Sequence, residues 1–215
     1  MIFSVNQILF VLQGLLWTVL LSVFGFVGGG ILGLGLALMR ASSVAALRTL
    51  ASGYIQLVQG IPLPVMMFVS YFGLTLTGYD VPALVAAALC MTVWSAAYLG
   101  EIWRGCIQAV PRTQWEAADS LALTTVQKMR DVILPQSVRL AIPPTVGFMV
   151  QIIKNTSYAV VIGFVELTQS GRVINNAVFE PFIIFTAVGA LYFSLCYPLS
   201  RLSRRLEARM RARGA

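Results

Sequence analysis

Five long apolar stretches, separated by shorter polar segments, dominate the pattern of hydrophobic and polar positions along the chain. Each stretch is near the ~20 apolar residues that a helix needs to cross the hydrocarbon core of a bilayer. The pattern therefore predicts an all-α integral membrane protein, with five transmembrane helices in one domain that covers residues 1–215. The expected spans are Leu12–Met39, Ala51–Thr77, Val81–Trp103, Ala141–Val165 and Pro181–Leu199.

The longest polar island, residues 104–140, separates the third span from the fourth. Two stretches in it fit the capping box, in which a Thr hydroxyl accepts from the amide three residues on and a Glu or Gln there reaches back to the cap. They are Thr113–Glu116 and Thr124–Gln127. Helices are expected over Gln114–Leu121 and Thr125–Leu134, so the island is predicted to be an ordered helix-turn-helix outside the bilayer.

The second of these helices carries apolar residues at helical spacing, namely Val126, Met129 and Ile133. This spacing predicts that the three side chains share one packed face. Pro135 is expected to end the helix, because proline lacks the amide that would continue it.

The composition supports a membrane protein, with 58% hydrophobic and 11% charged residues and a mean hydropathy of +0.83. The chain has no histidine, which excludes the usual zinc, haem, Ser-His and Cys-His arrangements. Cys90, Cys106 and Cys196 lie in or near apolar segments without paired spacing, so we expect small buried hydrophobic residues and no disulfide framework. The sequence predicts no catalytic residue, no metal site and no cofactor bound by this chain.

The net charge of +7 is typical of nucleic-acid binding proteins as well as of membrane proteins. Here the basic residues lie beside apolar spans, which favours a cytoplasmic membrane face over nucleic acid. With the N-terminus outside, every Lys and Arg except Lys154 and Arg172 falls on the cytoplasmic side, including the tail Arg201–Arg213. The expected topology is therefore N-out and C-in. Met1–Met39 carries no charge, which argues against a cleaved signal peptide.

A glycine cluster in the first span, Gly28-Gly-Gly-Ile-Leu-Gly33, matches the dinucleotide-binding pattern GxGxxG. No strand precedes it, and an apolar helix offers no solvated turn for a phosphate. We therefore interpret the cluster as a surface of small residues that lets another helix approach closely.

The second span is interrupted by Gln59-Gly-Ile-Pro62-Leu-Pro64. Glycine and prolines leave backbone groups free, which a membrane tolerates only where protein or a wet cavity receives them. Two interpretations stay open: a kink in a packed helix, and a lining of a transport pathway to which Gln59 contributes.

On the third span, Trp94, Tyr98 and Glu101 share one helix face. Glu101 lies near the inner end, where it can pair with a neighbouring Arg or contact a substrate. Trp94 and Tyr98 can be packing or interfacial residues.

In the fourth span, Lys154 lies about ten residues past Pro144, roughly 15 Å into the membrane and near its midplane. A Lys there costs at least about 2.5–3.5 kcal/mol, so its side chain must face protein or water. It can meet a substrate carboxylate, or it can pair with an acid such as Glu101 on another helix or subunit. Nearby polar residues able to add hydrogen bonds are Gln151, Asn155, Ser157 and Tyr158.

The polar island contains EAADSLAL from Glu116, then VILPQ and Arg139, and the prolines Pro143 and Pro144 follow it. It is flanked by Glu101-Ile-Trp-Arg-Gly and Lys154-Asn-Thr-Ser. This long spaced motif, which covers most of the chain, resembles that of ABC-importer permeases of the polar amino-acid (His/Glu/Gln/Arg/opine) uptake branch. The chain departs from that pattern in having Ala122 where Gly is typical, Gln59 for Arg and Ile61 for Thr, which puts in doubt any role of that Arg.

The resemblance implies that the Glu116–Gln127 loop docks on a separate ATPase subunit. The residues implied in this coupling are Glu116, Ala117, Ala118, Leu121, Ala122, Leu123, Gln127 and Pro135. Those considered for the substrate pathway are Gln59, Tyr98, Glu101, Gln151, Lys154, Asn155 and Ser157. The chain has no GxxxxGK[ST] motif, so ATP and Mg would be bound by the partner.

The implied assembly lies in the bacterial inner membrane. It contains two ATPase subunits, an identical or homologous permease, a periplasmic or lipid-anchored solute-binding protein and an amino-acid substrate. The alternative function is an ion-coupled carrier or a channel of five spans, for which an ordered helical loop has no evident use.

Overall fold

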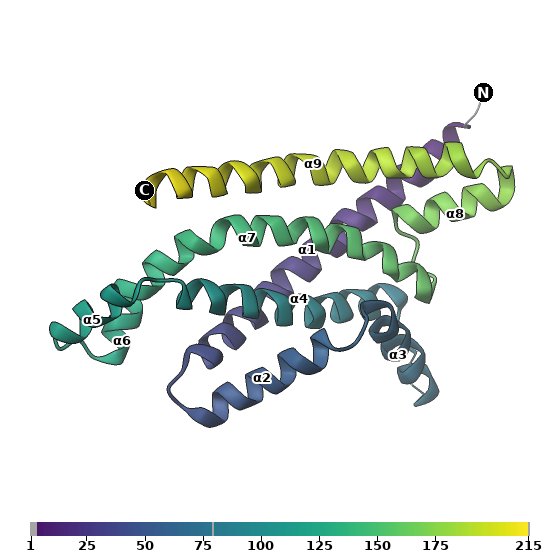
Figure 1. Ribbon diagram of the computed structural model, residues 1–215. Helices are drawn as coiled ribbons and strands as arrows, with labels where there is room; N and C mark the ends of the chain where they lie inside the picture. The colour runs from purple at the N-terminus through teal and green to yellow at the C-terminus, as the bar shows by residue number, and fades with distance from the viewer. Residues whose placement is uncertain (1–3, 79, 215) are drawn as a thin grey trace.

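In the computed structural model, which describes residues 4–78 and 80–214, the described chain is mostly helical and contains no strand. The helices form an elongated bundle with one short helical pair projecting from its end (Figure 1). They are α1 (Val5–Ala41), α2 (Ala45–Gln59), α3 (Leu63–Leu76), α4 (Ala83–Gln108), α5 (Arg112–Ser120), α6 (Thr125–Gln127), α7 (Leu134–Asn155), α8 (Leu167–Val178) and α9 (Pro181–Gly214).

Among the described residues, four helices are long and apolar enough to cross a membrane alone. The bent pair α2 and α3, which meet at an angle of 95°, counts as a fifth candidate span when the two helices are taken together. Gly60 ends α2, and Pro62 begins α3 with its fixed φ, so the predicted interruption is a sharp bend. The all-α fold with five candidate spans is therefore confirmed.

Pro135 does not end the loop helix, and this prediction is wrong. A π-helical segment, Lys128–Ile133, joins α6 to α7, and the Leu134 amide donates to the carbonyl of Met129, five residues back. Proline is tolerated in the first turn after this widened segment because its missing amide leaves no α-helical bond broken there. The fourth span therefore begins inside the loop and runs from Thr125 to Ile162, the last part as a 3₁₀ segment from Thr156.

The segment from Glu166 to Glu180, expected as a polar outer loop, contains the helix α8. The Glu166 carboxylate caps it by accepting from the amides of Thr168 and Gln169, at 2.8 and 2.9 Å. Leu167 and Ile174 bury one face of α8 while its other face is polar. A short amphipathic helix of this kind has too few apolar residues to register as a span, so the hydropathy pattern leaves it between the fourth and fifth spans without indicating a helix.

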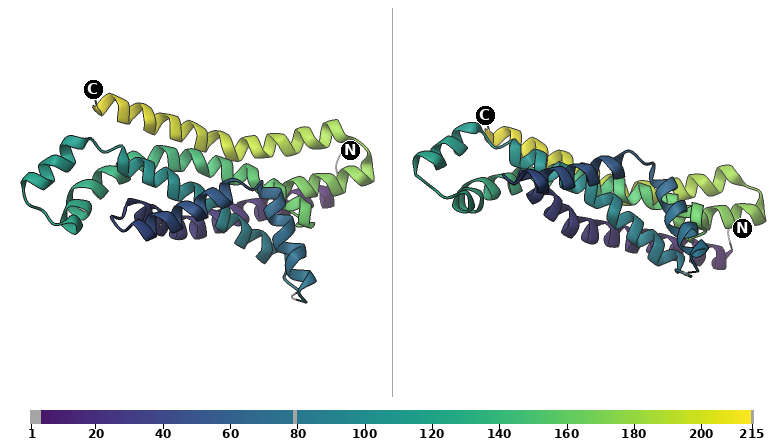
Figure 2. Two further views of the ribbon diagram at one scale, coloured as in Figure 1. Left: turned by 60° about the horizontal axis from the view of Figure 1, so that its bottom comes forward. Right: turned by 90° about the horizontal axis from the view of Figure 1, so that it is seen from below.

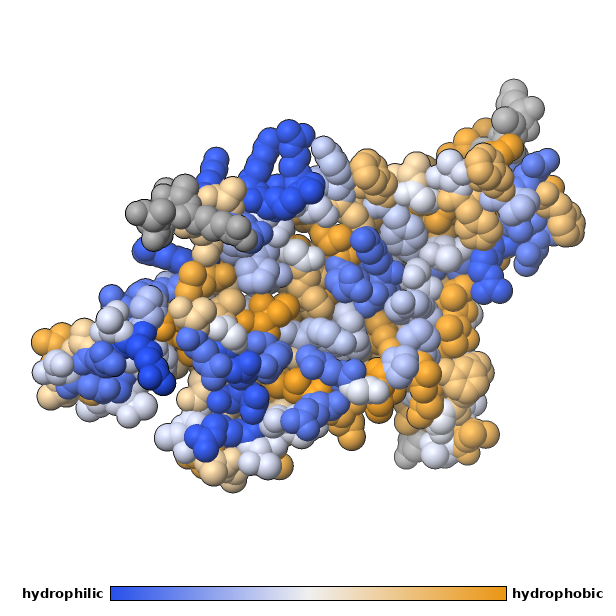
Figure 3. All heavy atoms as spheres, in the orientation of Figure 1, coloured by the Kyte–Doolittle hydropathy of each residue, from blue (hydrophilic) through white to orange (hydrophobic). Residues whose placement is uncertain are grey.

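The fifth span is also longer than expected, because α9 continues through the arginine tail to Gly214. The side chains of residues 211–214, including Arg211 and Arg213, lie outside the described part of the chain. Hydrophilic side chains gather over the C-terminal half of α9 and over the projecting loop (Figure 3). In every view the loop and the C-terminus lie at one end of the bundle, and α8 and the N-terminus at the other (Figure 2).

Glycines bring α1 and α4 into close contact, as the Gly28–Gly33 cluster predicts. A Cβ placed on Gly29 would lie 2.4 Å from the Cβ of Ser95, and one on Gly33 would lie 3.1 Å from the Ala96 carbonyl oxygen. The facing residues of α4 are themselves small or buried, including Gly100. The two backbones therefore approach at a distance that only glycine permits at these positions.

The turn between α5 and α6 closes around Ala122, which is left-handed with φ of 51°. The Leu123 amide donates to the Ala118 carbonyl at 3.2 Å, and the Ala122 amide donates to the Asp119 carbonyl at 2.9 Å. These two bonds form a Schellman motif with Ala122 at the position that usually holds glycine. The left-handed conformation considered from sequence is thus present, and the strain of an L-residue in it is retained.

We expect Gly29→Ala to destabilise the protein by on the order of 1–3 kcal/mol, because the added methyl overlaps Ser95. The matched control is Gly35→Ala, since no atom of another part of the chain lies within 4 Å of a Cβ there. Thermal unfolding in mild detergent measures both. Equal unfolding temperatures for the two variants would contradict close packing at Gly29.

We expect Ala122→Gly to stabilise the loop turn by roughly 1 kcal/mol, because glycine adopts the left-handed conformation without the Cβ penalty. Ala117→Gly, on the exposed side of α5, should instead destabilise the helix by roughly 0.5–1 kcal/mol. Hydrogen exchange of the Leu123 amide reports the turn directly. Faster exchange in Ala122→Gly would show that the turn does not depend on this backbone conformation.

Candidate functional site

The projecting loop is fixed to the bundle by a small hydrophobic cluster at the ends of α4 and α7. Ile107, Val110 and Ile133 are buried in this cluster, and Trp115 of α5 and Met129 pack against them. The side-chain amide of Gln136 also donates to Gln114, at 3.2 Å. The helical pair is therefore held as an ordered unit at the end of two spans (Figure 1).

The predicted capping box at Thr113 and Glu116 is wrong. Helix α5 begins at Arg112, two residues before the expected start at Gln114. Its N-cap is Pro111, which has a φ of −54° and an extended ψ. Thr113 is then already inside the helix and cannot cap it. Consequently the exposed Glu116 carboxylate has no hydrogen-bond or ion-pair partner among the described residues.

The second capping box is confirmed. The Gln127 amide donates to the Thr124 hydroxyl at 3.3 Å, and the Gln127 side chain accepts from the Thr124 amide at 3.0 Å. An ion pair between Lys128 and Asp119 further ties the two helices together across the turn. The turn of the loop is therefore fixed by caps and an ion pair as well as by packing.

Of the residues implied in coupling, only Ala118 is buried, and Leu123 is half-buried beside it. Glu116, Ala117, Leu121, Ala122, Gln127 and Pro135 are exposed. Leu121 is 73% exposed at the tip of the loop. Val126, assigned to the packed face from its spacing, is also 73% exposed, so that assignment is wrong. The loop thus presents an unpaired acid and two apolar side chains to its surroundings.

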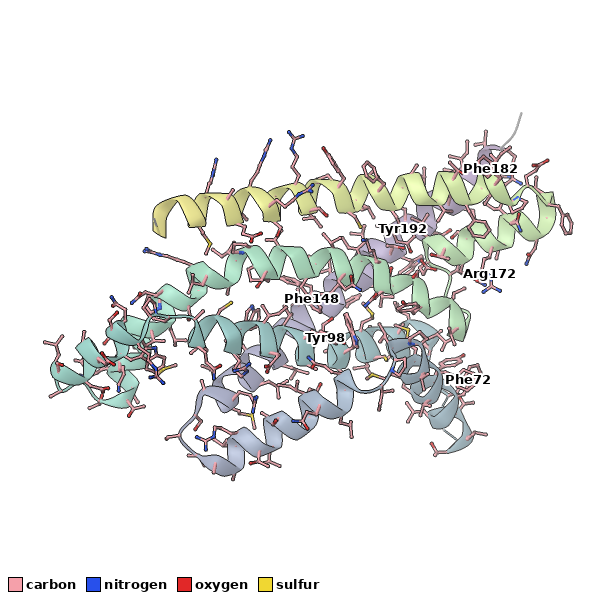
Figure 4. The ribbon with its side chains drawn as sticks, in the orientation of Figure 1. Phe72, Tyr98, Phe148, Arg172, Phe182 and Tyr192 are labelled. Carbon is pink, nitrogen blue, oxygen red and sulfur yellow. The ribbon has the colours of Figure 1, made fainter. Side chains whose placement is uncertain are left out.

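On α4, Tyr98 and Trp94 pack against Phe148 of α7, with ring centroids 5.4–5.6 Å apart (Figure 4). Trp94 is buried in the main hydrophobic core. The packing role considered for these two aromatic residues is therefore the one that the structure shows within this chain.

Glu101 accepts from the Nε of Arg104 at 2.8 Å and lies 3.9 Å from Arg40 of α1. Glu101 is thus paired with neighbouring arginines, which is the first of the two roles that the sequence left open. The described structure gives no contact between Glu101 and Lys154. The structural pair between these two residues is therefore absent within the described part of the chain.

Lys154 is exposed and lines a groove of about 630 Å³ between α7 and α9. Tyr192, Cys196 and Tyr197 of α9 lie along the same groove. Lys154 forms no ion pair with any described residue. The groove therefore presents an unpaired ammonium and two phenolic side chains.

The other pathway candidates lie on different surfaces. Asn155 is buried and accepts from the Gln151 side chain at 3.4 Å, while the Ser157 hydroxyl donates to the Lys154 carbonyl at 2.7 Å. Gln59 is exposed at the bend between α2 and α3. The structure groups Gln151, Lys154, Asn155 and Ser157 at the end of α7, and it does not place Glu101 with them.

Sequence reasoning missed a buried polar cluster around Glu166 at the end of the bundle that holds α8. Its carboxylate accepts from the Tyr192 hydroxyl at 2.8 Å, and Thr18 of α1 accepts from the Leu167 amide at 3.1 Å. The cluster joins α1, α8 and α9, and Tyr192 connects it to the Lys154 groove. Thr18 and Tyr192 are polar residues inside apolar spans, and this is the signal that could have indicated the cluster.

Comparison with known proteins agrees with this arrangement. The sequence profile of the family described as "Binding-protein-dependent transport system inner membrane component" matches residues 29–212. The chain is 36% identical to the probable amino-acid ABC transporter permease protein YckA of Bacillus subtilis (strain 168), over 90% of this chain and 85% of that protein. It is 34% identical to the probable amino-acid ABC transporter permease protein PatM of Vibrio harveyi, over 90% and 88%.

The fold is also shared with solved transporters. A chain of an amino acid ABC transporter crystallised with histidines is 33% identical, has a TM-score of 0.89 and is covered over 96% of its length by 95% of this chain. A chain of the MetNI methionine ABC transporter in an inward-facing conformation has a TM-score of 0.74 at 19% identity, with coverage of 95% and 99%, which shows the fold alone. Of the two functions left open by the sequence, these relatives support the ABC permease. The chain therefore belongs to the family of inner membrane components of binding-protein-dependent transport systems, as one of its membrane-spanning permeases.

Proposed function

We propose that this chain is the permease subunit of an ATP-driven importer that moves a polar amino acid across the bacterial inner membrane. The observation that carries the proposal is the ordered loop at the end of the bundle. It exposes Glu116, Leu121 and Val126 while its core residues fix it to α4 and α7. A loop of this kind is suited to contact a partner subunit and to transmit the partner's movement to the spans.

The partner in this proposal is an ATPase on a separate chain, since this sequence contains no GxxxxGK[ST] motif. ATP and Mg would be bound there. A pair of ATPase subunits would require a pair of permeases, identical or homologous, and a solute-binding protein on the outer side, periplasmic or anchored by lipid, would deliver the substrate.

The proposed orientation places the loop-bearing end in the cytoplasm. The C-terminal ends of α1, α4 and α9 lie at that end, and together with the loop they carry most of the described cations, whereas Arg172 lies on α8 at the opposite end (Figure 4). Positive charge concentrates on the cytoplasmic side of membrane proteins. This distribution supports an N-out, C-in topology.

For the substrate, relatives named as amino-acid permeases support an amino acid, and Lys154 supports a carboxylate as the recognised group. An exposed ammonium without an ion-pair partner among the described residues is available to a substrate carboxylate. Tyr192 and Tyr197, which line the same groove, add phenolic groups. Every amino acid carries this carboxylate, so Lys154 recognises the class and not the side chain.

We expect Glu116→Arg to abolish substrate-stimulated ATP hydrolysis and transport while the complex still assembles, because the reversed charge changes only an exposed, unpaired position. The measurement is ATP hydrolysis in liposomes with and without solute-binding protein and substrate. The matched control is Asp131→Arg, an exposed acid of the same loop that lies outside α5. Full stimulation in Glu116→Arg would remove Glu116 from the coupling surface.

We expect Lys154→Met to reduce uptake at least about tenfold, since removing one charge-assisted hydrogen bond costs roughly 1.5–3 kcal/mol. Radiolabelled amino-acid uptake in liposomes measures this loss, with recovery of the intact complex as the measure of assembly. Arg172→Met serves as the matched control, because it removes an exposed charge that does not line the groove. If Lys154→Met lowers only the recovery of the complex, the residue is structural.

A further inference from the structure

Three clefts on the surface of the bundle join end to end along α7. The first, between α7 and the tail of α9, and the second, between α7 and α1, share Ile142. The second and the third, which is closed by α9, share Phe26 and Met149. The three clefts therefore follow one another along α7, as a groove that begins at the loop-bearing end and runs into the membrane-spanning part.

A single stripe of α7 forms the floor of this groove: Arg139, Ile142, Val146, Met149 and Ile153. The successive spacings of three and four residues place these side chains on one helix face. Only the first residue is charged. From Ile142 to Ile153 the stripe extends roughly 16 Å, which matches the ~15 Å hydrocarbon depth of one bilayer leaflet.

The apolar part of the groove offers a ligand no unsatisfied polar group. The Ser22 and Ser137 hydroxyls donate to carbonyls of their own helices, at 2.7 and 3.0 Å. The Thr145 hydroxyl accepts from the Trp103 indole at 2.8 Å. A polar amino acid would lose its hydration here without compensation, so this groove is unsuited to the transported substrate.

The end of the groove nearest the loop does offer polar groups to a ligand. It is a cleft of about 560 Å³ lined by Arg139 of α7 and Arg209 of α9. Both side chains are exposed, and neither has a hydrogen-bond or ion-pair partner among the described residues. Leu140, Leu206 and Met210 provide apolar walls beside them. Two unpaired guanidiniums at an apolar cleft match the charge of a phosphate that is attached to a hydrocarbon chain.

We propose that this groove binds an anionic phospholipid of the inner leaflet, with its phosphate between Arg139 and Arg209 and one acyl chain along the α7 stripe. The proposal rests on the proposed function for two statements, that the chain spans a membrane and that the loop-bearing end lies in the cytoplasm. The bound lipid would fill the space between α7, α1 and α9 that no side chain of the described chain fills.

The test uses the full transporter complex and native mass spectrometry, with phosphatidylglycerol and phosphatidylcholine as the two probes. We expect phosphatidylglycerol to bind preferentially, and the double variant Arg139→Gln/Arg209→Gln to weaken it roughly tenfold or more. The matched control is Arg201→Gln/Arg205→Gln. It removes two arginines of α9, the helix that carries Arg209, and neither of them lines the groove. The control should leave phosphatidylglycerol binding unchanged.

A second variant, Val146→Trp, tests the acyl-chain part by filling the stripe, and should lower the binding of both lipids in complexes that assemble normally. Equal loss of binding in the two arginine variants would overturn the proposal, because it would show general attraction to a basic surface. Displacement of the lipid by inorganic phosphate would overturn it in favour of a simple anion site. A disulfide between two copies of Ile142→Cys would overturn it by showing that a second permease covers the groove.

Because these readouts report lipid binding, they separate this proposal from the proposed import function. Intact transport with no selective lipid binding rejects only the lipid site. Selective lipid binding in a complex that fails to transport any amino acid rejects only the proposed substrate class.

Discussion

The close contact between α1 and α4 is the interaction on which the rest of the bundle depends. Inside a bilayer, lipid tails are as apolar as leucine, so burial of apolar surface does not drive helices together. Association then relies on van der Waals contact over a fitted surface, and Gly29 and Gly33 let the α4 backbone reach that of α1. With these two helices fixed, α7 packs on α4 through Phe148, and α8 and α9 join α1 through the Glu166 cluster.

The sequence predicts the spans well because the bilayer imposes a length and a polarity that are visible in any chain. It also identifies the glycine contact and the bend at Pro62, each of which follows from the backbone geometry of one residue type. The errors occur where tertiary contacts decide. Pro111 displaces the start of α5, a π-helical segment carries the chain past Pro135, and Glu166 caps a helix in a segment too polar to register as one.

For the candidate site, the sequence motif locates the loop, but it does not show which side chains of the loop are exposed. Spacing alone assigned Val126 to the packed face, although the π-helical segment changes the register after it and leaves the side chain exposed. The environment of Lys154 depends on α9, which is distant in sequence, so no local pattern indicates Tyr192 beside it. The sequence left two roles open for Glu101, an ion pair with a neighbouring Arg and contact with substrate. The positions of Arg40 on α1 and of Arg104 one turn away show that Glu101 is paired.

The uninterrupted path from the loop into the fourth span has a mechanical consequence. Thr125 and Lys154 belong to one continuous helical element of 38 residues, with no hinge of flexible loop between them. At 1.5 Å per residue, Lys154 lies roughly 43 Å along this element from the loop. A tilt of roughly 5° about the loop end would displace Lys154 by roughly 4 Å, more than the length of a hydrogen bond. In the proposed function, this element would turn a small angular change at the loop into a displacement near Lys154 large enough to make or break a contact, with Pro143 and Pro144 inside the helix between the two ends.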